Sequence, residues 1–294
     1  TVTHSEEEGL IVKSVTAGGP AEEAGIVPGD RITAVEGAST AELGLEESKV
    51  RIRGEEGTTV VLTVLHDGTE QEVTVERRSI VTEVATGTLM DGGIGYIKIA
   101  NFEQNCASQT IAAIEELTRQ GATSLLFDVR FNPGGLKTEL CTVLDYLLPE
   151  GPIFKSVDYS GREETIRSGA SCVTLPMAVL VNEDSYSAAE FFAAALQEYG
   201  VATVVGQKTC GKGYFQKTYL LSDGSAVALS SGAYYTPNGV SLAEVGGLEP
   251  DIAVPMEDED YANLYYGALA REDDAQLQAA VAALQEENPA KKGE

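Results

Sequence analysis

Two continuous apolar runs of strand length, residues 125–129 and 176–181, most constrain what this chain can fold into. Each is followed within a few residues by a helical pattern, and an unbroken apolar run is typical of a strand covered on both faces. From about residue 84 onward such strands alternate with longer helices, including strands over residues 94–99 and 201–205. The alternation predicts βαβ units in an α/β (α+β) domain over residues 84–255.

Residues 1–83 have a different rhythm of short strands and tight turns. Residues 60–65 and 72–76 flank an Asp67-Gly68 turn, which predicts a hairpin. Short helices are expected over residues 20–25 and 45–53. Residues 256–294 form an acidic segment with a terminal helix over 276–284. Because the chain starts at Thr1 rather than Met, we expect that an upstream segment has been removed.

Charge and composition exclude several function classes. The chain has 20 Lys and Arg against 46 Asp and Glu, a formal net charge of −26. Nucleic-acid binding is therefore not expected, because it depends on Lys and Arg neutralising phosphates. No apolar run approaches the about 20 residues of a membrane span. The two histidines and four widely spaced cysteines lack zinc-site spacing, so we expect no metal and no cofactor. The cysteines could form two bridges or none.

The junction between a strand and a helix over residues 179–190 is the first candidate for chemistry. It contains Ser185 and Ser187, at a helix start where free backbone N–H groups and the positive dipole end converge. Such donors stabilise an oxyanion, so one of these serines could be a nucleophile. Serine is also a favoured N-cap, and from this segment alone capping is the simpler interpretation.

A serine nucleophile needs a base, and Lys212 is the candidate because both histidines lie in the first 83 residues. Lysine acts as a base when burial favours its neutral form; an ordinary surface lysine is the alternative. Residues 206–212 also fit the start of a phosphate-binding loop, but Gly213 replaces the required Ser or Thr and a strand follows. The glycines of Asn132-Pro133-Gly134-Gly135 can bring backbone N–H groups close to a ligand, or simply form a turn.

Together these residues resemble the carboxyl-terminal processing proteases, serine peptidases with a Ser–Lys dyad and a PDZ domain. The resemblance runs from about residue 1 to 255, and the shared order of its motifs carries it. The matching segments are Gly19-Pro20-Ala21-Glu22-Glu23-Ala24-Gly25-Ile26, Pro28-Gly29-Asp30, Gly95-Tyr96-Ile97, Asp128-Val129-Arg130, Asn132-Pro133-Gly134-Gly135, Ser185-Tyr186-Ser187-Ala188-Ala189-Glu190, Thr209-Cys210-Gly211-Lys212-Gly213, Tyr234-Tyr235-Thr236-Pro237 and Gly247-Leu248-Glu249-Pro250-Asp251.

The resemblance implies a crotonase/ClpP-like βαβ superhelix over residues 84–255, and it assigns roles. Ser187 would be the nucleophile, Lys212 the general base and Gln216 the partner that orients the lysine. Ala188 would give one oxyanion donor and either Gly134 or Gly135 the other. Tyr186 stands where many relatives carry a small residue, which puts specificity rather than chemistry in question.

The resemblance further implies a PDZ domain over residues 1–83, truncated at its N-terminus because a glycine-containing segment is expected just before Thr1. Its edge strand would be Leu10, Ile11 and Val12, with the helix that carries Val50 and Arg53 as the opposite wall. The expected partners are protein or peptide substrates with exposed C-terminal tails. A membrane anchor on the full-length form, a homodimer and an extracytoplasmic location are also expected. The alternatives are a non-catalytic ligand-binding protein or a PDZ adaptor on the same scaffold.

Overall fold

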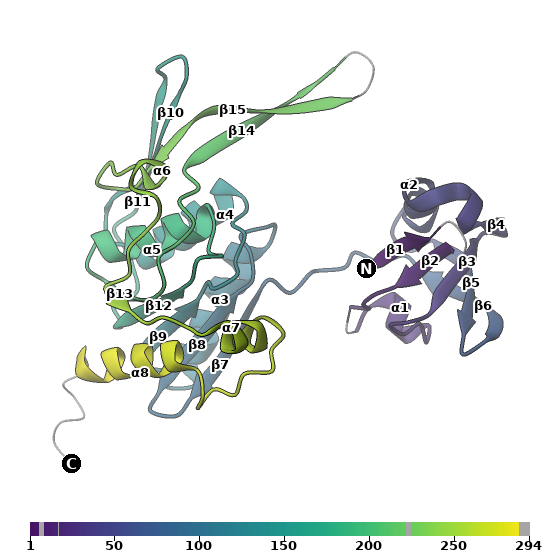
Figure 1. The fold of residues 1–294 in the computed structure, drawn as a ribbon, viewed down its shortest axis with the longest axis horizontal. Helices are drawn as coiled ribbons and strands as arrows, with labels where there is room; N and C mark the ends of the chain where they lie inside the picture. The colour runs from purple at the N-terminus through teal and green to yellow at the C-terminus, as the bar shows by residue number, and fades with distance from the viewer. Residues whose placement is uncertain (6–8, 17, 222–224, 288–294) are drawn as a thin grey trace. The chain divides into compact units, whose positions relative to one another are not determined.

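The computed structural model describes residues 1–5, 9–16, 18–221 and 225–287. The chain divides into two units, Thr1–Thr82 and Glu83–Glu294 (Figure 1). The segment after residue 255 belongs to the second unit, where its terminal helix packs on the main sheet.

The first unit is a small sheet with two helices. Its strands run in the order β1-β2-β3-β5-β6, with β4 paired to β3. The elements are β1 (Val2–Ser5), β2 (Gly9–Val12), α1 (Pro20–Glu23), β3 (Arg31–Val35), β4 (Ala38–Ser39), α2 (Thr40–Ile52), β5 (Thr59–His66) and β6 (Thr69–Glu76). The hairpin predicted around Asp67-Gly68 is confirmed: both turn residues have positive φ, the geometry that an Asp-Gly turn favours.

The predicted edge strand of this unit is wrong. Leu10, Ile11 and Val12 lie in β2, which pairs with β1 on one side and β3 on the other. Leu10 and Val12 are buried in the core of the unit. Among the described residues β1 is the edge strand next to β2, and β6 is the strand at the opposite edge of the sheet. β1 has only four residues, and its two central ones, Thr3 and His4, are polar. Such a short and polar segment has too weak a strand pattern to be predicted from the sequence.

The second unit is built on a six-stranded sheet in the order β16-β13-β12-β9-β8-β7. All neighbours are parallel except β7 and β8. The strands are β7 (Ala85–Met90), β8 (Ile94–Ile99), β9 (Ser124–Asp128), β12 (Met177–Val181), β13 (Ala202–Gly206) and β16 (Ile252–Ala253). Every residue of β9 and β12 is buried, as predicted from their apolar runs.

Helices cover both faces of this sheet. One face packs against α3 (Cys106–Arg119), α4 (Lys137–Leu147) and α5 (Ala188–Glu198) in a single apolar core. On the other face α8 (Ala275–Glu287) buries Leu277, Ala280 and Leu284 against β9, β12 and β13. The predicted α+β architecture with βαβ units is confirmed by this layering.

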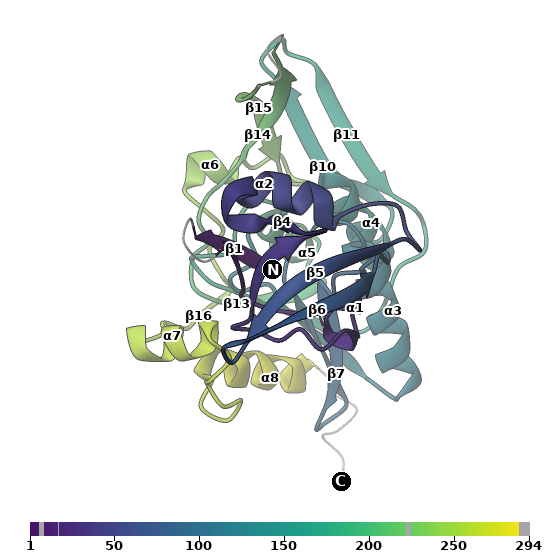
Figure 2. The same cartoon turned by 90° about the vertical axis from the view of Figure 1, so that its right-hand side faces the viewer.

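A second, four-stranded sheet in the order β11-β10-β15-β14 rises from the same unit (Figure 2). Its strands are β10 (Gly151–Asp158), β11 (Glu163–Ser168), β14 (Tyr214–Leu220) and β15 (Ala226–Tyr235), and the β14–β15 hairpin projects beyond the other elements (Figure 1). The strand expected after Gly213 is confirmed as β14, whereas β10 and β11 were not predicted. β11 is largely exposed and polar, so it lacks the apolar signal of a buried strand, and in β10 the polar residues Lys155 and Ser156 interrupt the apolar ones.

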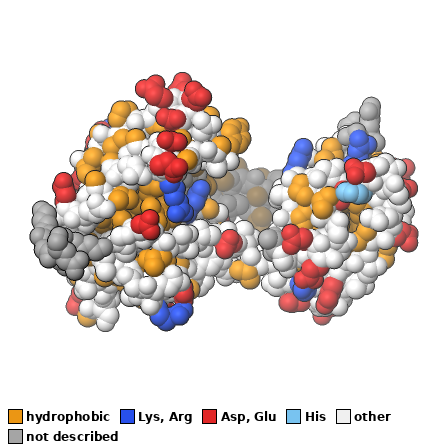
Figure 3. Space-filling model, turned by 90° about the horizontal axis from the view of Figure 1, so that it is seen from below, with side chains coloured by type: hydrophobic (Ala, Val, Ile, Leu, Met, Phe, Trp, Pro, Cys, Tyr) orange, Lys and Arg blue, Asp and Glu red, His pale blue; other side chains and the backbone are white. Residues whose placement is uncertain are grey.

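Short helices α6 (Leu242–Val245) and α7 (Asp258–Tyr265) complete the second unit. Asp and Glu side chains are spread over both units in the face shown in Figure 3, whereas Lys and Arg gather in a few places. Within the described residues no helix is long and apolar enough to cross a membrane. All four cysteines are free.

Candidate active site

Three neighbouring parallel strands deliver the candidate residues to one edge of the main sheet. β9 leads into the glycine loop (residues 129–136), β12 into the nucleophile loop (182–187) and β13 into the lysine loop (207–213). Parallel neighbours end at the same edge, so the topology itself brings these three loops together. No single stretch of sequence contains this arrangement.

The structure separates the two candidate serines. Ser185 is fully buried; its hydroxyl donates to Val129 O at 2.8 Å and accepts from the Asn182 N–H at 3.1 Å. Ser187 is half-buried at the N-cap of α5, with φ 51° and ψ −115°. A positive φ is unfavourable for serine and is held here by the surrounding bonds, which is typical of residues in functional turns. Ser185 therefore joins the nucleophile loop to the glycine loop, and the half-buried Ser187 is the candidate nucleophile.

Glu190 ties the nucleophile loop to the lysine loop, and sequence reasoning gave it no role. Its side chain is completely buried and accepts four hydrogen bonds. Oε2 accepts from the Ser187 N–H at 2.8 Å and the Lys212 N–H at 2.9 Å. Oε1 accepts from Thr209 Oγ1 at 2.5 Å and the Gly211 N–H at 2.6 Å. The sequence feature that could have indicated this role is the Ser-x-x-Glu spacing from Ser187 to Glu190, which is typical of a capping box.

Lys212 is held by its backbone but not by its side chain. The side chain is exposed, and its Nζ makes no hydrogen bond or ion pair with any residue that the structure describes. The burial expected of a lysine base is therefore absent in this conformation. β14 begins at Tyr214, so a strand follows the lysine and the phosphate-loop interpretation is excluded.

Gln216 does not contact Lys212 in this structure. Its side chain is exposed, and its Nε2 donates to Tyr214 O at 3.2 Å. It lines a polar cleft of about 420 Å³ together with Lys137, Glu164 and Lys217, among others. The predicted orienting bond from Gln216 to the lysine is thus not formed here.

The glycine loop lies directly against the nucleophile. A side chain at Gly134 would come within 2.9 Å of Ser187 Cβ and 3.0 Å of the Ala188 nitrogen, and its φ is 91°, so only glycine fits. The Gly134 N–H donates to Asn132 Oδ1 at 2.8 Å. The Gly135 N–H has no acceptor among the described residues. Ala188 is the first residue of α5, so its N–H has no acceptor within the helix.

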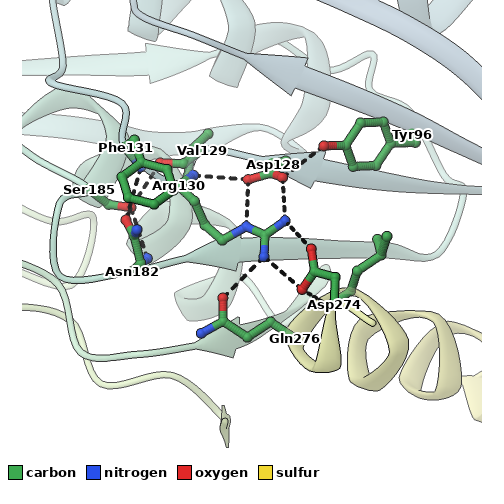
Figure 4. A network of polar contacts seen from close by, with 10 residues as sticks. Tyr96, Asp128, Val129, Arg130, Phe131, Asn182, Ser185, Asp274 and Gln276 are labelled. Carbon is green, nitrogen blue, oxygen red and sulfur yellow. Dashed lines mark hydrogen bonds and ion pairs between the residues drawn. The ribbon is translucent and has the colours of Figure 1, made fainter. Parts of the chain in front are cut away.

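A buried ion-pair network is built around Arg130 of this loop (Figure 4). Arg130 makes two side-chain hydrogen bonds to Asp128, at 2.7 and 3.0 Å, and two to Asp274, at 2.8 and 3.0 Å. Although burial alone would raise the pKa of Asp128, the Arg130 guanidinium holds it below its usual range. The network joins the end of β9 to the start of α8, 144 residues apart.

Asn182 connects the nucleophile and glycine loops above that network (Figure 4). Its Oδ1 accepts from the Phe131 N–H at 2.9 Å, while the Tyr186 N–H donates to Asn132 O at 2.9 Å. Phe131 itself has a positive φ of 60°. Two loops from neighbouring strands thus brace each other, which gives the serine and the glycines a defined mutual geometry.

A serine at a strained strand-to-helix turn, beside backbone N–H donors, defines the class: a candidate serine hydrolase attached to a small β-rich unit. The comparisons agree with this class. The model of peptidase family S41 matches residues 93–254, and the PDZ domain model matches residues 2–76.

The chain is similar over most of its length to several processing proteases. A carboxyl-terminal-processing protease of Synechocystis sp. is 36% identical over 283 residues, which cover 94% of this chain and 65% of that protein. The carboxy-terminal processing protease CtpA of Bacillus subtilis is 34% identical over 265 residues, 89% of this chain and 56% of that protein. The chain thus spans less than two thirds of these relatives. The solved photosystem II D1 C-terminal processing protease has a TM-score of 0.54 at 28% identity, over 86% of this chain and 71% of that one.

The chain therefore belongs to peptidase family S41 and carries a PDZ domain. Both were expected from the sequence motifs.

Proposed function

We propose that this protein is a serine endopeptidase that cleaves near the C-terminal tails of protein substrates. The observation that carries the proposal is the convergence of Ser187 and Lys212 on one buried carboxylate oxygen of Glu190. Ser187 Oγ attacks the peptide carbonyl, while neutral Lys212 Nζ accepts its proton. The protonated lysine then gives this proton to the nitrogen of the scissile C–N bond, which breaks, and the amine leaves. Water hydrolyses the remaining ester of the acyl-enzyme to a carboxylate and frees Ser187.

The side chain of Lys212 has to turn toward Ser187 for this step. Glu190 already holds the lysine backbone next to the nucleophile loop, and substrate that covers the site would exclude water from the amine. The described conformation is then a resting one. Gln216, now bound to Tyr214 O, would release that contact to orient the lysine.

Ala188 and Gly135 are the best-supported oxyanion donors. Both backbone N–H groups lack a protein acceptor among the described residues, whereas that of Gly134 already donates to Asn132. Gly134 has a different task, since its missing side chain leaves room for Ser187 and Ala188. Two backbone donors of this kind stabilise the charge that develops on the carbonyl oxygen.

The PDZ domain would select substrates by their tails. In such domains a peptide adds as a strand beside the sheet edge, which here is β1, and α2 is the opposite wall. A cavity of about 340 Å³ lined by Val2, Ile32, Ile52 and Leu62, among others, can accept an apolar terminal side chain. Arg53 lines the same cavity and can pair with the terminal carboxylate, whereas Val50 is 66% exposed and lies outside it.

An extracytoplasmic location, a membrane anchor on the full-length form and a homodimer remain predictions from the resemblance. The absence of a metal or cofactor, expected from the few histidines and widely spaced cysteines, also remains a prediction. The main alternative function is tail binding without cleavage, on the same scaffold.

The deciding experiment combines a fluorophosphonate probe with cleavage of an unstructured peptide that has an apolar C-terminus. We expect the probe to label Ser187, and we expect Ser187→Ala and Lys212→Ala each to lose several orders of magnitude in rate, about 4–8 kcal/mol. Lys208→Ala is the matched control, because Lys208 lies in the same loop and pairs with exposed Glu249 instead. Tail binding without labelling or cleavage in the wild type would favour the alternative function.

A further inference from the structure

In the nucleophile loop, the carboxylate of Asp184 accepts hydrogen bonds from two tyrosine hydroxyls. The Asp184 carboxylate accepts a hydrogen bond from the Tyr186 hydroxyl at 2.9 Å through Oδ1. Through Oδ2 it accepts one from the Tyr261 hydroxyl at 2.6 Å. Tyr261 belongs to α7, 77 residues further along the chain. A single carboxylate thus joins α7 to the residue that directly precedes Ser187.

α7 also contacts the glycine loop. The rings of Tyr261 and Tyr265 both pack edge-on against Phe131, with centroids 4.8 and 5.3 Å away. The two tyrosines differ in one respect: the Tyr261 hydroxyl binds Asp184, and that of Tyr265 makes no hydrogen bond to a described residue. α7 therefore contacts two of the three loops that form the site, the nucleophile loop at Asp184 and the glycine loop at Phe131.

Tyr186 in turn reaches the third loop. Its hydroxyl donates to Asp184, and its phenol lies near the thiol of Cys210, two residues before Lys212. Its backbone is fixed as well, since its N–H donates to Asn132 O and its carbonyl accepts from the Ala189 N–H. With both the backbone and the hydroxyl held, the ring cannot swing aside without breaking hydrogen bonds.

We propose that Tyr186 forms a wall beside Ser187 that favours substrates with small residues flanking the scissile bond, and that Asp184 and Tyr261 are positioning residues for this wall. The inference rests on the proposed peptidase function. A bulky side chain next to the scissile bond would have to displace the ring and lose its bond to Asp184. The carboxylate also raises the pKa of Tyr186 to about 12, so the hydroxyl remains a donor throughout the neutral range.

Two peptides test the wall directly: one with alanine on both sides of the scissile bond and one with leucine. We expect the wild type to prefer the alanine peptide in kcat/KM, and Tyr186→Ala to lower that preference about tenfold, the scale on which a pocket discriminates one or two methylenes. Tyr261→Phe should lower it in the same direction by about threefold, as expected for the loss of one supporting hydrogen bond. Tyr265→Phe, which removes the corresponding hydroxyl from the same helix, should leave it unchanged.

A variant that slows both peptides equally would show general damage rather than positioning, and it would overturn the inference. The same holds if Tyr261→Phe and Tyr265→Phe have the same peptide preference.

The second measurement is independent of peptidase activity. Cys210 is exposed and lies near the Tyr186 phenol, so its reaction with a thiol reagent reports on how firmly the ring is held. We expect Tyr261→Phe to accelerate this reaction about threefold and Tyr265→Phe not to change it, with Cys210→Ser identifying the signal. If no variant cleaves peptide, the proposed function fails, but a faster Cys210 reaction in Tyr261→Phe alone still supports the positioning role. Equal rates in both variants contradict it.

Discussion

Glu190 and Lys212 are joined by a hydrogen bond of 2.9 Å from the lysine backbone N–H to the buried carboxylate. The same oxygen accepts the Ser187 N–H. The separation of the nucleophile and lysine loops is therefore set by one side chain of α5.

Replacing that carboxylate should uncouple the loops. Glu190→Gln leaves four donors facing a side chain with one acceptor oxygen and an NH2 group, so at least one buried N–H or O–H loses its partner. We expect a loss of about 2–4 kcal/mol in unfolding free energy and about 100-fold in peptide cleavage. Glu183→Gln, an exposed change in the nucleophile loop, is the control. Full activity of Glu190→Gln would argue against a role in assembling the site.

The Arg130 network should make the C-terminal segment essential for the stability of the second unit. Asp274→Asn places an amide nitrogen against the guanidinium and leaves a buried charge partly unpaired. We expect it to cost about 3–5 kcal/mol in urea unfolding of the whole chain. Asp273→Asn, at the exposed neighbouring position, should change the unfolding free energy little. Equal midpoints for the two variants would contradict the role of the ion pair.

Arg53 should contribute to tail binding by the PDZ domain. Arg53→Glu reverses a charge at the cavity that we propose for the terminal residue, and we expect it to weaken binding of a free-carboxylate peptide about five- to tenfold. Arg51→Glu makes the same change in net charge two residues earlier, in the last turn of α2, but Arg51 pairs with Glu47 and lies outside the cavity. Binding is measured by fluorescence anisotropy in the Ser187→Ala background. If the amidated peptide binds as well as the free acid, the carboxylate assignment is wrong.

His66 should make the stability of the first unit depend on pH. Its hydrogen bond to buried Asp30, 2.5 Å long, raises the pKa of His66 above the ordinary 6.5. Because the folded-state pKa is raised, the stabilisation is complete below pH 6.5 and is lost as the pH rises through the folded-state value. We expect the urea midpoint of this unit to fall as the pH rises above 6.5, and to fall less in His66→Gln. An identical pH dependence of the wild type and His66→Gln would refute the prediction.

Tight turns and buried strands could be predicted from the local sequence. Asp67-Gly68 specifies a turn with positive φ, and the apolar runs of β9 and β12 specify strands covered on both faces. Exposed strands such as β11 were missed because their polar residues have no buried face to reveal them. β1 was missed for the same reason, and this placed the edge of the PDZ sheet one strand too far along the chain.

What the amino-acid sequence alone determined is the inventory of the site: the order of its motifs identified the family and pointed to Ser187, Lys212 and the glycines. Only the tertiary structure decided how that inventory is arranged. It brought Glu190 to two loops, joined Tyr261 to Asp184 across 77 residues and left the Lys212 side chain in solvent. The physical reason is that strand and helix patterns are local, whereas hydrogen bonds between loops depend on which parallel strands become neighbours.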